Sequence, residues 1–222
     1  ADAVGSESAM LGIAYDGDSD RVLLCDSLGR PIDGDIMLWI IGRYLSSRSG
    51  LGAGVVATVM SNMLLDEKLA SEGIKVFRCP VGDRYVVEKM RESHAKLGGE
   101  QSGHIIASDY VATGDGLYTG ILFLRACREL GEDIATLVDR FPRYPQLLRN
   151  LRLPDRESVL SSVPLKEAIG RAEKKLLGAG RVLLRPSGTE PLLRILVEAR
   201  DEALMNSICD ELESVIMHAR DG

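Results

Sequence analysis

Short apolar runs alternate with helix-like stretches along residues 1–131, and this alternation restricts the fold more than any other feature. Residues 11–15 (LGIAY) and 74–79 (IKVFRC) are typical of strands, whereas residues 35–48 (DIMLWIIGRYLSSR) carry apolar side chains at helical spacing. Parallel strands need long crossover connections, which helices supply. Strands and helices in turn at this spacing therefore predict an α/β domain with a mostly parallel sheet.

The remaining elements of this domain follow the same pattern, with glycine at the end of the helices. Further strands are predicted at 21–26, 52–61 and 104–109, and further helices at 62–73, 83–98 and 115–131.

The sequence changes character after Gly131. The segment FPRYPQ (141–146) contains two prolines within four residues and is typical of a hinge. Beyond it, the pattern predicts a second, small α+β domain. Its strands are expected at 147–153, 181–185 and 192–199, and its amphipathic helices at 164–178 and 202–219.

Composition excludes several classes of protein. A net charge of -6 without a basic stripe argues against nucleic-acid binding. No apolar run reaches the roughly 18–20 residues of a membrane helix, and the N-terminus has no signal pattern. The cysteines are scattered singly, which predicts reduced thiols in a cytoplasmic protein. They are Cys25, Cys79, Cys127 and Cys209.

The loop after the strand at 11–15 carries Asp16, Asp18 and Asp20, followed by Arg21. Carboxylates at every second position of a non-helical turn can converge on one point, and oxygen ligands suit Mg²⁺ or Ca²⁺. In α/β proteins, ligands bind beyond the carboxyl ends of strands. The spacing therefore predicts a site for a hard cation, with a solvated acidic turn as the simpler alternative.

Two known acidic motifs fit this loop less well. An EF-hand counted from Asp16 requires glycine at its sixth position and glutamate at its twelfth, where the chain has Arg21 and Ser27. An aspartyl-phosphatase loop shares the D-x-D pattern, but its fifth position is usually threonine or valine, and here it is Asp20. A Mg²⁺-dependent phosphatase with Asp16 as nucleophile is therefore disfavoured.

A second polar loop, GGEQSGH (98–104), leads into the predicted strand at 104–109. Glu100, Ser102 and His104 offer a carboxylate acceptor, a hydroxyl and an imidazole. Carboxylates suit sugar hydroxyls, and a histidine can act as acid or base near neutral pH. The loop predicts a site for a hydroxylated substrate, and a polar turn with a structural histidine is the alternative.

A third loop, RPSGTEP (185–191), joins two predicted strands. Arg185, a tight Ser-Gly-Thr turn and Arg194 in the next strand supply guanidinium groups, hydroxyls and backbone N–H groups, which together bind phosphate. A plain turn between strands is the alternative, and no Walker A pattern occurs in the sequence.

A weaker anion-binding candidate is Arg84, which with Asp83 opens the helix predicted at 83–98. The same two residues would serve equally well as a helix cap and a surface charge. The three loops together indicate a divalent cation, a hydroxylated substrate and a phosphate, and this combination predicts phosphosugar chemistry.

The motifs DGDSDR, GGEQSGH and RPSGTEP resemble, in this order, the metal, sugar and phosphate loops of the α-D-phosphohexomutases. Within that superfamily, VMSNMLLDEKL, VGDRYVVEKM, TGDGL and PQLLRNLR are most similar to the bacterial phosphoglucosamine mutases, and the resemblance covers essentially all 222 residues. It implies the C-terminal half of a four-domain protein. The parts would be the end of domain 2 (1–21), a mixed, mostly parallel α/β/α sandwich as sugar-binding domain 3 (22–141), and a small α+β, TATA-box-binding-protein-like, phosphate-binding domain 4 (142–222).

The resemblance also implies a reaction and a role for each loop. Glucosamine 6-phosphate and glucosamine 1-phosphate would interconvert through a phosphoserine and a bisphosphorylated intermediate. Asp16, Asp18 and Asp20 would hold Mg²⁺, and Arg21 would lie beside the transferring phosphate. The remaining implied substrate contacts are Glu100 and Ser102 for sugar hydroxyls, His104 for substrate contact or proton transfer, and Arg185, Ser187, Gly188, Thr189 and Arg194 for the phosphate that does not react.

One part of the family's pattern is missing, because no phosphoserine loop of the type S-A-S-H-N-P occurs in the sequence. We therefore expect a piece of a longer mutase that binds cation and phosphosugar but is inactive alone. Its expected partners are the phosphosugar and the N-terminal domains with the phosphoserine, without nucleic acid or membrane; a homodimer is one assembly that this allows. A phosphomannomutase or phosphoglucomutase, or a non-catalytic phosphosugar-binding module, are the alternatives.

Overall fold

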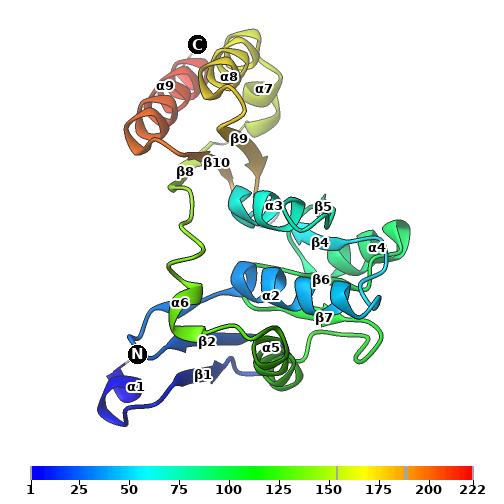
Figure 1. Ribbon diagram of the computed structural model, residues 1–222. Helices are drawn as coiled ribbons and strands as arrows, with labels where there is room; N and C mark the ends of the chain where they lie inside the picture. Colours follow the sequence, from blue (N-terminus) through cyan, green and yellow to red (C-terminus); the bar gives the residue numbers. More distant parts are fainter. Residues whose placement is uncertain (1, 154, 188–189, 222) are drawn as a thin grey trace. The chain divides into compact units, whose positions relative to one another are not determined.

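Two structural units, Ala1–Pro142 and Arg143–Gly222, make up the chain in the computed structural model (Figure 1). The structure describes residues 2–153, 155–187 and 190–221, and each unit is described by itself. The division between the units falls inside the proline-containing segment 141–146, where the sequence predicts a hinge.

A four-stranded sheet with the strand order β5-β4-β6-β7 lies at the centre of the first unit. β4 (Val55–Thr58) runs parallel to β5 (Val76–Cys79) and to β6 (Leu97–Gly99), whereas β7 (Ile105–Ala107) is antiparallel to β6. Every residue of β4 is buried, as expected for a parallel strand that is covered on both faces. The predicted α/β domain with a mixed, mostly parallel sheet is confirmed.

Helices cover both faces of this sheet. Val56 packs with Val86 and Met90 of α4 (Asp83–Ser93) on one face. The side chain of the neighbouring Val55 points the other way, toward α2. The other helices of this unit are α2 (Gly34–Ser47), α3 (Met63–Ala70), α5 (Gly116–Leu130) and the short α1 (Asp2–Ser6) and α6 (Ile134–Leu137).

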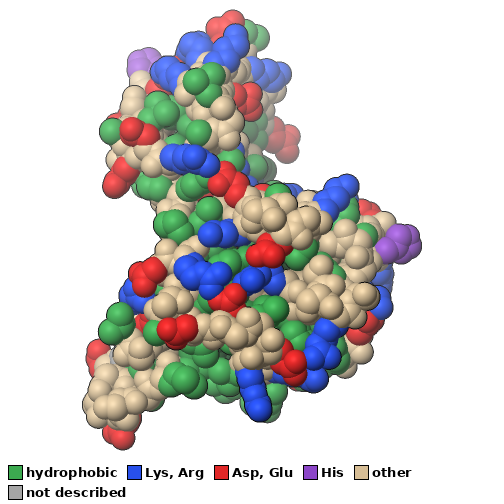
Figure 2. Space-filling model, in the orientation of Figure 1, with side chains coloured by type: hydrophobic (Ala, Val, Ile, Leu, Met, Phe, Trp, Pro, Cys, Tyr) green, Lys and Arg blue, Asp and Glu red, His purple; other side chains and the backbone are tan. Residues whose placement is uncertain are grey.

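α2 is buried along most of its length because it packs against α3, α5 and β6. Its first turn is fixed by Asp33, whose side chain accepts hydrogen bonds from the backbone N–H groups of Asp35 and Ile36. Charged side chains of both signs lie side by side on the face seen in Figure 2. One ion pair joins Arg48, the residue after α2, to Glu129 of α5 at 2.6 Å, but exposed pairs contribute little, so packing holds α2 in place.

A small antiparallel sheet with the order β1-β2-β3 also belongs to the first unit. β1 (Leu11–Tyr15) and β2 (Val22–Asp26) pair as a hairpin in which Tyr15 lies opposite Val22, and β3 (Pro31–Ile32) pairs with β2. Residues 16–21, the acidic loop, connect β1 to β2. β1 and β2 also contact α5, which brings the hairpin against the body of this unit.

The helix predicted at 83–98 is wrong over its last residues. α4 ends at Ser93, because His94 adopts a left-handed backbone conformation with a φ of 58°. Leu97–Gly99 then enters the sheet as β6. Glycine at position 98 permits this, since a Cβ there would lie 2.7 Å from the sulfur of Met90. A pattern based on helical spacing does not register this requirement for close packing.

The second unit is a three-stranded antiparallel sheet with two long helices, so the predicted α+β domain is confirmed. The strand order is β8-β10-β9. A short helix that the sequence did not predict, α7, precedes α8. The elements are β8 (Gln146–Arg152), α7 (Arg156–Ser161), α8 (Val163–Leu176), β9 (Gly180–Pro186), β10 (Leu192–Ala199) and α9 (Glu202–Asp221).

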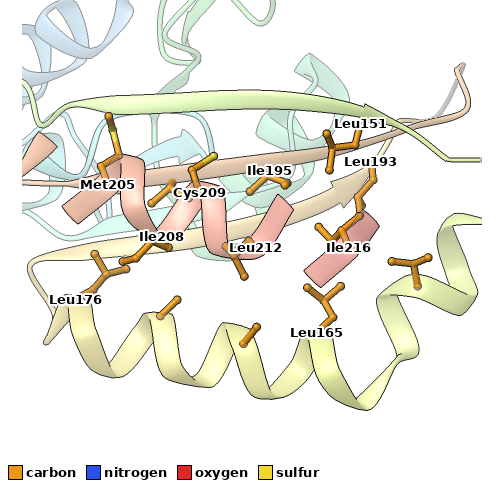
Figure 3. Close-up of a cluster of buried hydrophobic side chains, with 14 of the residues drawn as sticks. Leu151, Leu165, Leu176, Leu193, Ile195, Met205, Ile208, Cys209, Leu212 and Ile216 are labelled. Atoms are coloured by element: carbon orange, nitrogen blue, oxygen red, sulfur yellow. The ribbon is translucent and has the colours of Figure 1, made fainter. Parts of the chain in front are cut away.

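One face of this sheet encloses the core of the second unit together with α8 and α9 (Figure 3). Leu193 and Ile195 of β10 are fully buried there with Leu165 of α8 and Leu212 of α9. Because side chains alternate along a strand, Arg194 lies on the opposite face of the sheet. Arg185 of β9 pairs with Arg194 in the ladder, so both arginines of the third predicted loop lie on that opposite face.

The cysteines are unpaired, and Cys79, Cys127 and Cys209 are buried. Burial raises the pKa of Cys79 to about 11 and that of Cys127 to about 12, so both thiols stay protonated and act as packing groups. Within the described ranges, none of the helices combines the length and apolar character needed to cross a lipid bilayer.

Candidate functional site

The structure brings Asp16, Asp18 and Asp20 together in the acidic loop, where one oxygen atom from each lies within 4.8 Å of the others. The turn is closed by the backbone: the Ser19 N–H donates to the Asp16 carbonyl at 3.2 Å, and the Arg21 N–H donates to Asp16 Oδ1 at 3.2 Å. Ser19 takes a left-handed conformation, with a φ of 59°. This reversal directs the alternating carboxylates toward one point.

The negative charge of the acidic loop is only partly matched by protein groups. Arg21 Nε lies 3.7 Å from Asp16 Oδ2 and 3.8 Å from Asp20 Oδ1. Asp18 has no ion pair among the described residues, and the buried Asp20 Oδ1 accepts no hydrogen bond from them. A buried carboxylate oxygen without a donor is costly, and a cation would satisfy it. The donor set, three carboxylates, therefore fits a hard divalent ion.

The loop at 98–104 packs directly against the acidic loop. His104 is buried, and its Nδ1 lies 3.1 Å from Asp20 Oδ2; an ionised carboxylate there requires the proton on Nδ1. The Val22 N–H donates to the Gly103 carbonyl at 3.2 Å, and Arg21 pairs with His104 as an isolated bridge. His104 therefore lies beside Asp20 and does not line the cavity described below.

A third segment, 113–117 (TGDGL), supports the acidic loop from another side. The Gly116 N–H donates to the Ser19 carbonyl at 2.9 Å. A Cβ on Gly116 would lie 2.6 Å from the Arg21 carbonyl, and one on Gly114 would lie 2.3 Å from the His104 ring. Asp115 caps α5 by accepting the Tyr118 N–H at 2.8 Å. The sequence reasoning assigned these residues no role; two glycines around a helix cap were the available signal.

A cavity of about 410 Å³ lies at the carboxyl ends of the parallel strands β4, β5 and β6. It joins Arg21 of the acidic loop to Glu100 and Ser102, so the structure brings residues from the first two predicted loops to one cavity. The residues that line it are Arg21, Thr58, Met60, Val81, Glu100, Gln101 and Ser102.

Glu100 is anchored by neighbouring backbone. Its Oε1 accepts the Gly82 N–H at 2.9 Å, and Ser102 Oγ lies 3.5 Å from its Oε2. The first residue of α2 also holds the turn at 100–102, because the Gly34 N–H donates to the Gln101 carbonyl at 3.0 Å. A Cβ on Gly34 would lie 1.9 Å from the Glu100 carbonyl, so only glycine allows this approach.

Arg84 does not join these residues in the structure. It is exposed in the first turn of α4 and does not line the cavity. The alternative is confirmed only for the surface charge, because the N-cap of α4 is Gly82 and no side chain caps the helix; the Arg84 N–H donates to Asp83 Oδ1 at 2.6 Å.

In the second unit, Arg185 of β9 and Arg194 of β10 lie directly opposite each other. Burial and the positive charge of Arg194 lower the pKa of Arg185. Arg194 Nε is buried without a hydrogen-bond partner among the described residues, and its guanidinium reaches Glu190 only at 3.9 Å. Gly188 and Thr189 of the predicted phosphate loop lie outside the described residues.

Elsewhere in the same ladder of β9 and β10, residues of opposite charge face each other. Arg181 lies opposite Glu198, and the two form an ion pair at 2.7 Å. Opposite charges across a ladder stabilise it, whereas like charges such as Arg185 and Arg194 repel. An anion between these two guanidinium groups would relieve the repulsion.

The sequence reasoning missed Arg156, which fixes the described ends of the loop at 185–191. Its Nη1 donates to the Ser187 carbonyl at 2.6 Å and to the Glu190 carbonyl at 2.5 Å. Ser187 is itself buried, and its Oγ accepts the Glu190 N–H at 3.4 Å. Arg156 stands far from the loop in the chain and belongs to no local motif, so no sequence signal pointed to it.

Two protein-family models match the chain. Residues 33–144 match the phosphoglucomutase/phosphomannomutase alpha/beta/alpha domain III, and residues 148–215 match the phosphoglucomutase/phosphomannomutase C-terminal domain. The acidic loop, 16–21, lies outside both matches.

Curated relatives match nearly the whole chain. The phosphoglucosamine mutase of Desulforudis audaxviator is 49% identical over 215 residues, covering 96% of this chain and 48% of that protein. The phosphoglucosamine mutase of Carboxydothermus hydrogenoformans is 46% identical over 215 residues, with the same coverage of 96% and 48%. The chain thus spans about half the length of the curated relatives it matches.

Solved structures share the fold. A phosphoglucomutase/phosphomannomutase family protein from Burkholderia thailandensis superposes with a TM-score of 0.76 at 27% identity, covering 100% of this chain and 49% of that one. The Aspergillus fumigatus N-acetylphosphoglucosamine mutase, in complex with GlcNAc-6P and magnesium, gives a TM-score of 0.78 at 19% identity, covering 94% and 48%. The second similarity concerns the fold alone.

Replacing Gly103 by alanine (G103A) is expected to lower the free energy of unfolding of the first unit by about 3 kcal/mol. The new Cβ would lie 2.1 Å from the Val22 carbonyl oxygen, at a φ of 93°. Urea unfolding followed by the fluorescence of Trp39, the single tryptophan, measures the change.

The matched control is G17A, in the acidic loop itself, where a Cβ meets nothing within 4 Å. Its stability should change by less than about 0.5 kcal/mol. Equal stability of G103A and G17A would contradict the close fit between the acidic loop and the segment at 103–104.

Proposed function

Because the chain belongs to the phosphoglucomutase/phosphomannomutase family, we propose that it is the cation-, sugar- and phosphate-binding half of a phosphoglucosamine mutase. The observation that carries this proposal is the cavity at the carboxyl ends of β4, β5 and β6, where Arg21 of the acidic loop meets Glu100 and Ser102. In this proposal residues 1–21 end domain 2, residues 22–141 form domain 3, and residues 142–222 form domain 4.

The whole protein interconverts glucosamine 6-phosphate and glucosamine 1-phosphate through a phosphoserine and a bisphosphorylated intermediate. The serine belongs to the part of the relatives that this chain does not cover. Phosphoryl transfer depends mainly on positioning and on neutralising the charge of the transferring group. The residues of this chain supply both.

Asp16, Asp18 and Asp20 hold Mg²⁺ in this proposal. Support comes from their oxygen-only donor set and from the buried Asp20 Oδ1, which receives no hydrogen bond from the part of the chain that the structure describes. When bound, the ion neutralises negative charge on the phosphoryl group. Arg21 lies between the acidic loop and the cavity, so its guanidinium is placed to contact the same phosphoryl oxygens.

Glu100 and Ser102 bind hydroxyl or amine groups of the sugar. Glu100 is half-buried. Its Oε1 accepts the Gly82 N–H, and its Oε2 faces the Ser102 hydroxyl. His104 orients Asp20 in this proposal, since it is buried against that carboxylate. This assignment replaces the direct substrate contact and proton transfer that the resemblance implies for it.

Arg185 and Arg194 grip the phosphate that does not react, with Ser187, Gly188 and Thr189 as the turn between their strands. Support comes from the two facing guanidinium groups, whose one ion pair among the described residues is the long contact of Arg194 with Glu190 at 3.9 Å. Arg156 keeps the turn closed by binding two of its carbonyl groups.

A phosphomannomutase or phosphoglucomutase is the alternative, because a protein distinguishes an amine from a hydroxyl at C2 of the sugar by only a few contacts. The curated relatives described above favour the amine. A phosphosugar-binding module without catalysis is a further alternative, and binding and turnover separate it from an enzyme half.

The 222-residue chain is expected to bind glucosamine 6-phosphate without mutase turnover, because its sequence contains no phosphoserine loop. Nuclear magnetic resonance titration should shift the amides of Met60, Gln101 and Ser102, with smaller shifts for glucose 6-phosphate and mannose 6-phosphate. Formation of glucosamine 1-phosphate by this chain alone would contradict the proposal, and so would an absence of any shift.

The variants D18N and D20N are expected to weaken Mn²⁺ binding at least about tenfold, because each removes one charged oxygen ligand. Titration calorimetry measures the affinity. D83N, which changes an exposed aspartate in α4, serves as the control and should bind Mn²⁺ as the unchanged chain does. A loss no larger than that of D83N would exclude the acidic loop as the cation site.

R185A is expected to weaken the binding of inorganic phosphate to the second unit about tenfold, because it removes one of two facing guanidinium groups. The measurement is the shift of β9 and β10 amides during a phosphate titration. R171A provides the control, since Arg171 lies on α8 and pairs with Glu211 at 3.1 Å. Equal phosphate affinity of R185A and R171A would contradict the assigned grip.

A further inference from the structure

The turn after β4, residues 58–62, forms part of the wall of the cavity through Thr58 and Met60. Thr58, Ser61 and Asn62 are buried, which is unusual for a polar turn. Buried polar groups of this kind need fixed partners. The turn receives them from two charged side chains, Arg78 and Asp35.

Arg78, at the end of β5, holds the turn by its carbonyl oxygens. Nη1 donates to Thr58 O at 2.6 Å and to Ser61 O at 2.8 Å, and Nη2 donates to Asn62 O at 3.1 Å. The guanidinium also pairs with Asp66 in the first turn of α3. One planar side chain thus fixes three carbonyl groups, which the single ammonium group of a lysine cannot do in the same geometry.

Asp35, in the first turn of α2, holds the same turn by a backbone donor. Its Oδ2 accepts the Asn62 N–H at 2.9 Å, and the Asn62 side chain in turn caps α3 by accepting the Leu64 N–H at 3.2 Å. Asp35 is fully buried. Its hydrogen bond therefore connects the start of α2 to the wall of the cavity.

The residue before Asp35 holds another wall of the same cavity. The Gly34 N–H donates to the carbonyl of Gln101, which lines the cavity between Glu100 and Ser102. Two successive residues at the start of α2 therefore bind the turns that follow β4 and β6. Their spacing along α2 sets the distance between these two turns.

Asp35 holds this position at a cost in stability. Burial, together with the negative charge of Asp33, raises the pKa of Asp35 to about 7, and the Asn62 N–H, Ser61 and the charge of Arg78 offset this only in part. The ordinary value is 3.8, so the folded chain retains a proton that the unfolded chain loses. The fold is therefore favoured most at low pH, and its stability falls as the pH rises from 3.8 to about 7.

We propose that Asp35 and Arg78 are positioning residues for the phosphosugar, which hold residues 58–62 as a preformed wall of the cavity. The inference rests on the proposed function of that cavity. A residue that lowers stability at neutral pH yet fixes a binding wall is the expected pattern at a functional site. The charged groups that act on Asp35 are Asp33 from its own segment and Arg78 from β5, with Asp66 of α3 paired to Arg78.

The first arm of the test needs no ligand. In the unchanged chain, the Asn62 amide shift should change with pH around an inflection near 7, and in D35N this inflection should disappear. Over the same range, raising the pH from 6 to 8 should lower the melting temperature of the unchanged chain more than that of D35N. D26N is the matched control, because Asp26 is equally buried but binds Leu28 and Arg30 away from the cavity.

The second arm measures the affinity for glucosamine 6-phosphate by amide shifts at pH 8. D35A and R78K should each bind at least about fivefold more weakly, with the Met60 and Gln101 amides shifted in the free protein. D35N, which keeps an oxygen acceptor, should bind nearly as well as the unchanged chain at pH 8. Below pH 7, where Asp35 takes up a proton, the affinity of the unchanged chain should change relative to that of D35N. D26N should keep both the affinity and its pH dependence.

The outcomes separate the two levels of the account. If the unchanged chain binds glucosamine 6-phosphate and D35A and R78K, both folded, bind it equally well, only the positioning role is wrong. If the unchanged chain does not bind it at all, the proposed function fails and the inference fails with it.

Discussion

Three carboxylates within 4.8 Å of one another repel, so the surrounding backbone has to hold the acidic loop in its conformation. The Gly116 N–H, which donates to Ser19 inside the loop, and the Val22 N–H, which follows the loop and donates to Gly103, do this. Both contacts need residues without a side chain, because a Cβ would collide with carbonyl oxygen atoms. The acidic loop, the segment at 98–104 and the segment at 113–117 are therefore one structural group, and the cavity beside it depends on all three.

The parallel sheet explains why this group lies next to a cavity. The carboxyl ends of β4, β5 and β6 meet at one edge, so the turns that follow them converge although they are far apart in the sequence. The start of α2 ties two of these turns together through Gly34 and Asp35. The proposed phosphoryl transfer would require positioned groups more than reactive ones, which is what these tied turns offer.

Local patterns in the sequence predicted most elements and the clustering of the acidic loop, because alternation of apolar residues and the spacing of carboxylates are local properties. They could not predict β6, since that strand depends on Gly98 fitting beneath Met90. Local patterns also could not predict the roles of Arg156, Arg78 and Asp35, because each of these side chains binds a turn that is distant in the sequence. His104 was recognised as important, but only the fold places it against Asp20 and outside the cavity lining.

The central claim is that the acidic loop is a preformed site for a divalent cation. Diffraction at the manganese absorption edge, from crystals of this chain grown with Mn²⁺, tests it most directly. The account predicts an anomalous peak within the acidic loop, with oxygen atoms of Asp16, Asp18 and Asp20 at roughly 2.0–2.3 Å from the ion. A loop without a peak at saturating Mn²⁺, or a peak bound only elsewhere on the chain, would contradict it.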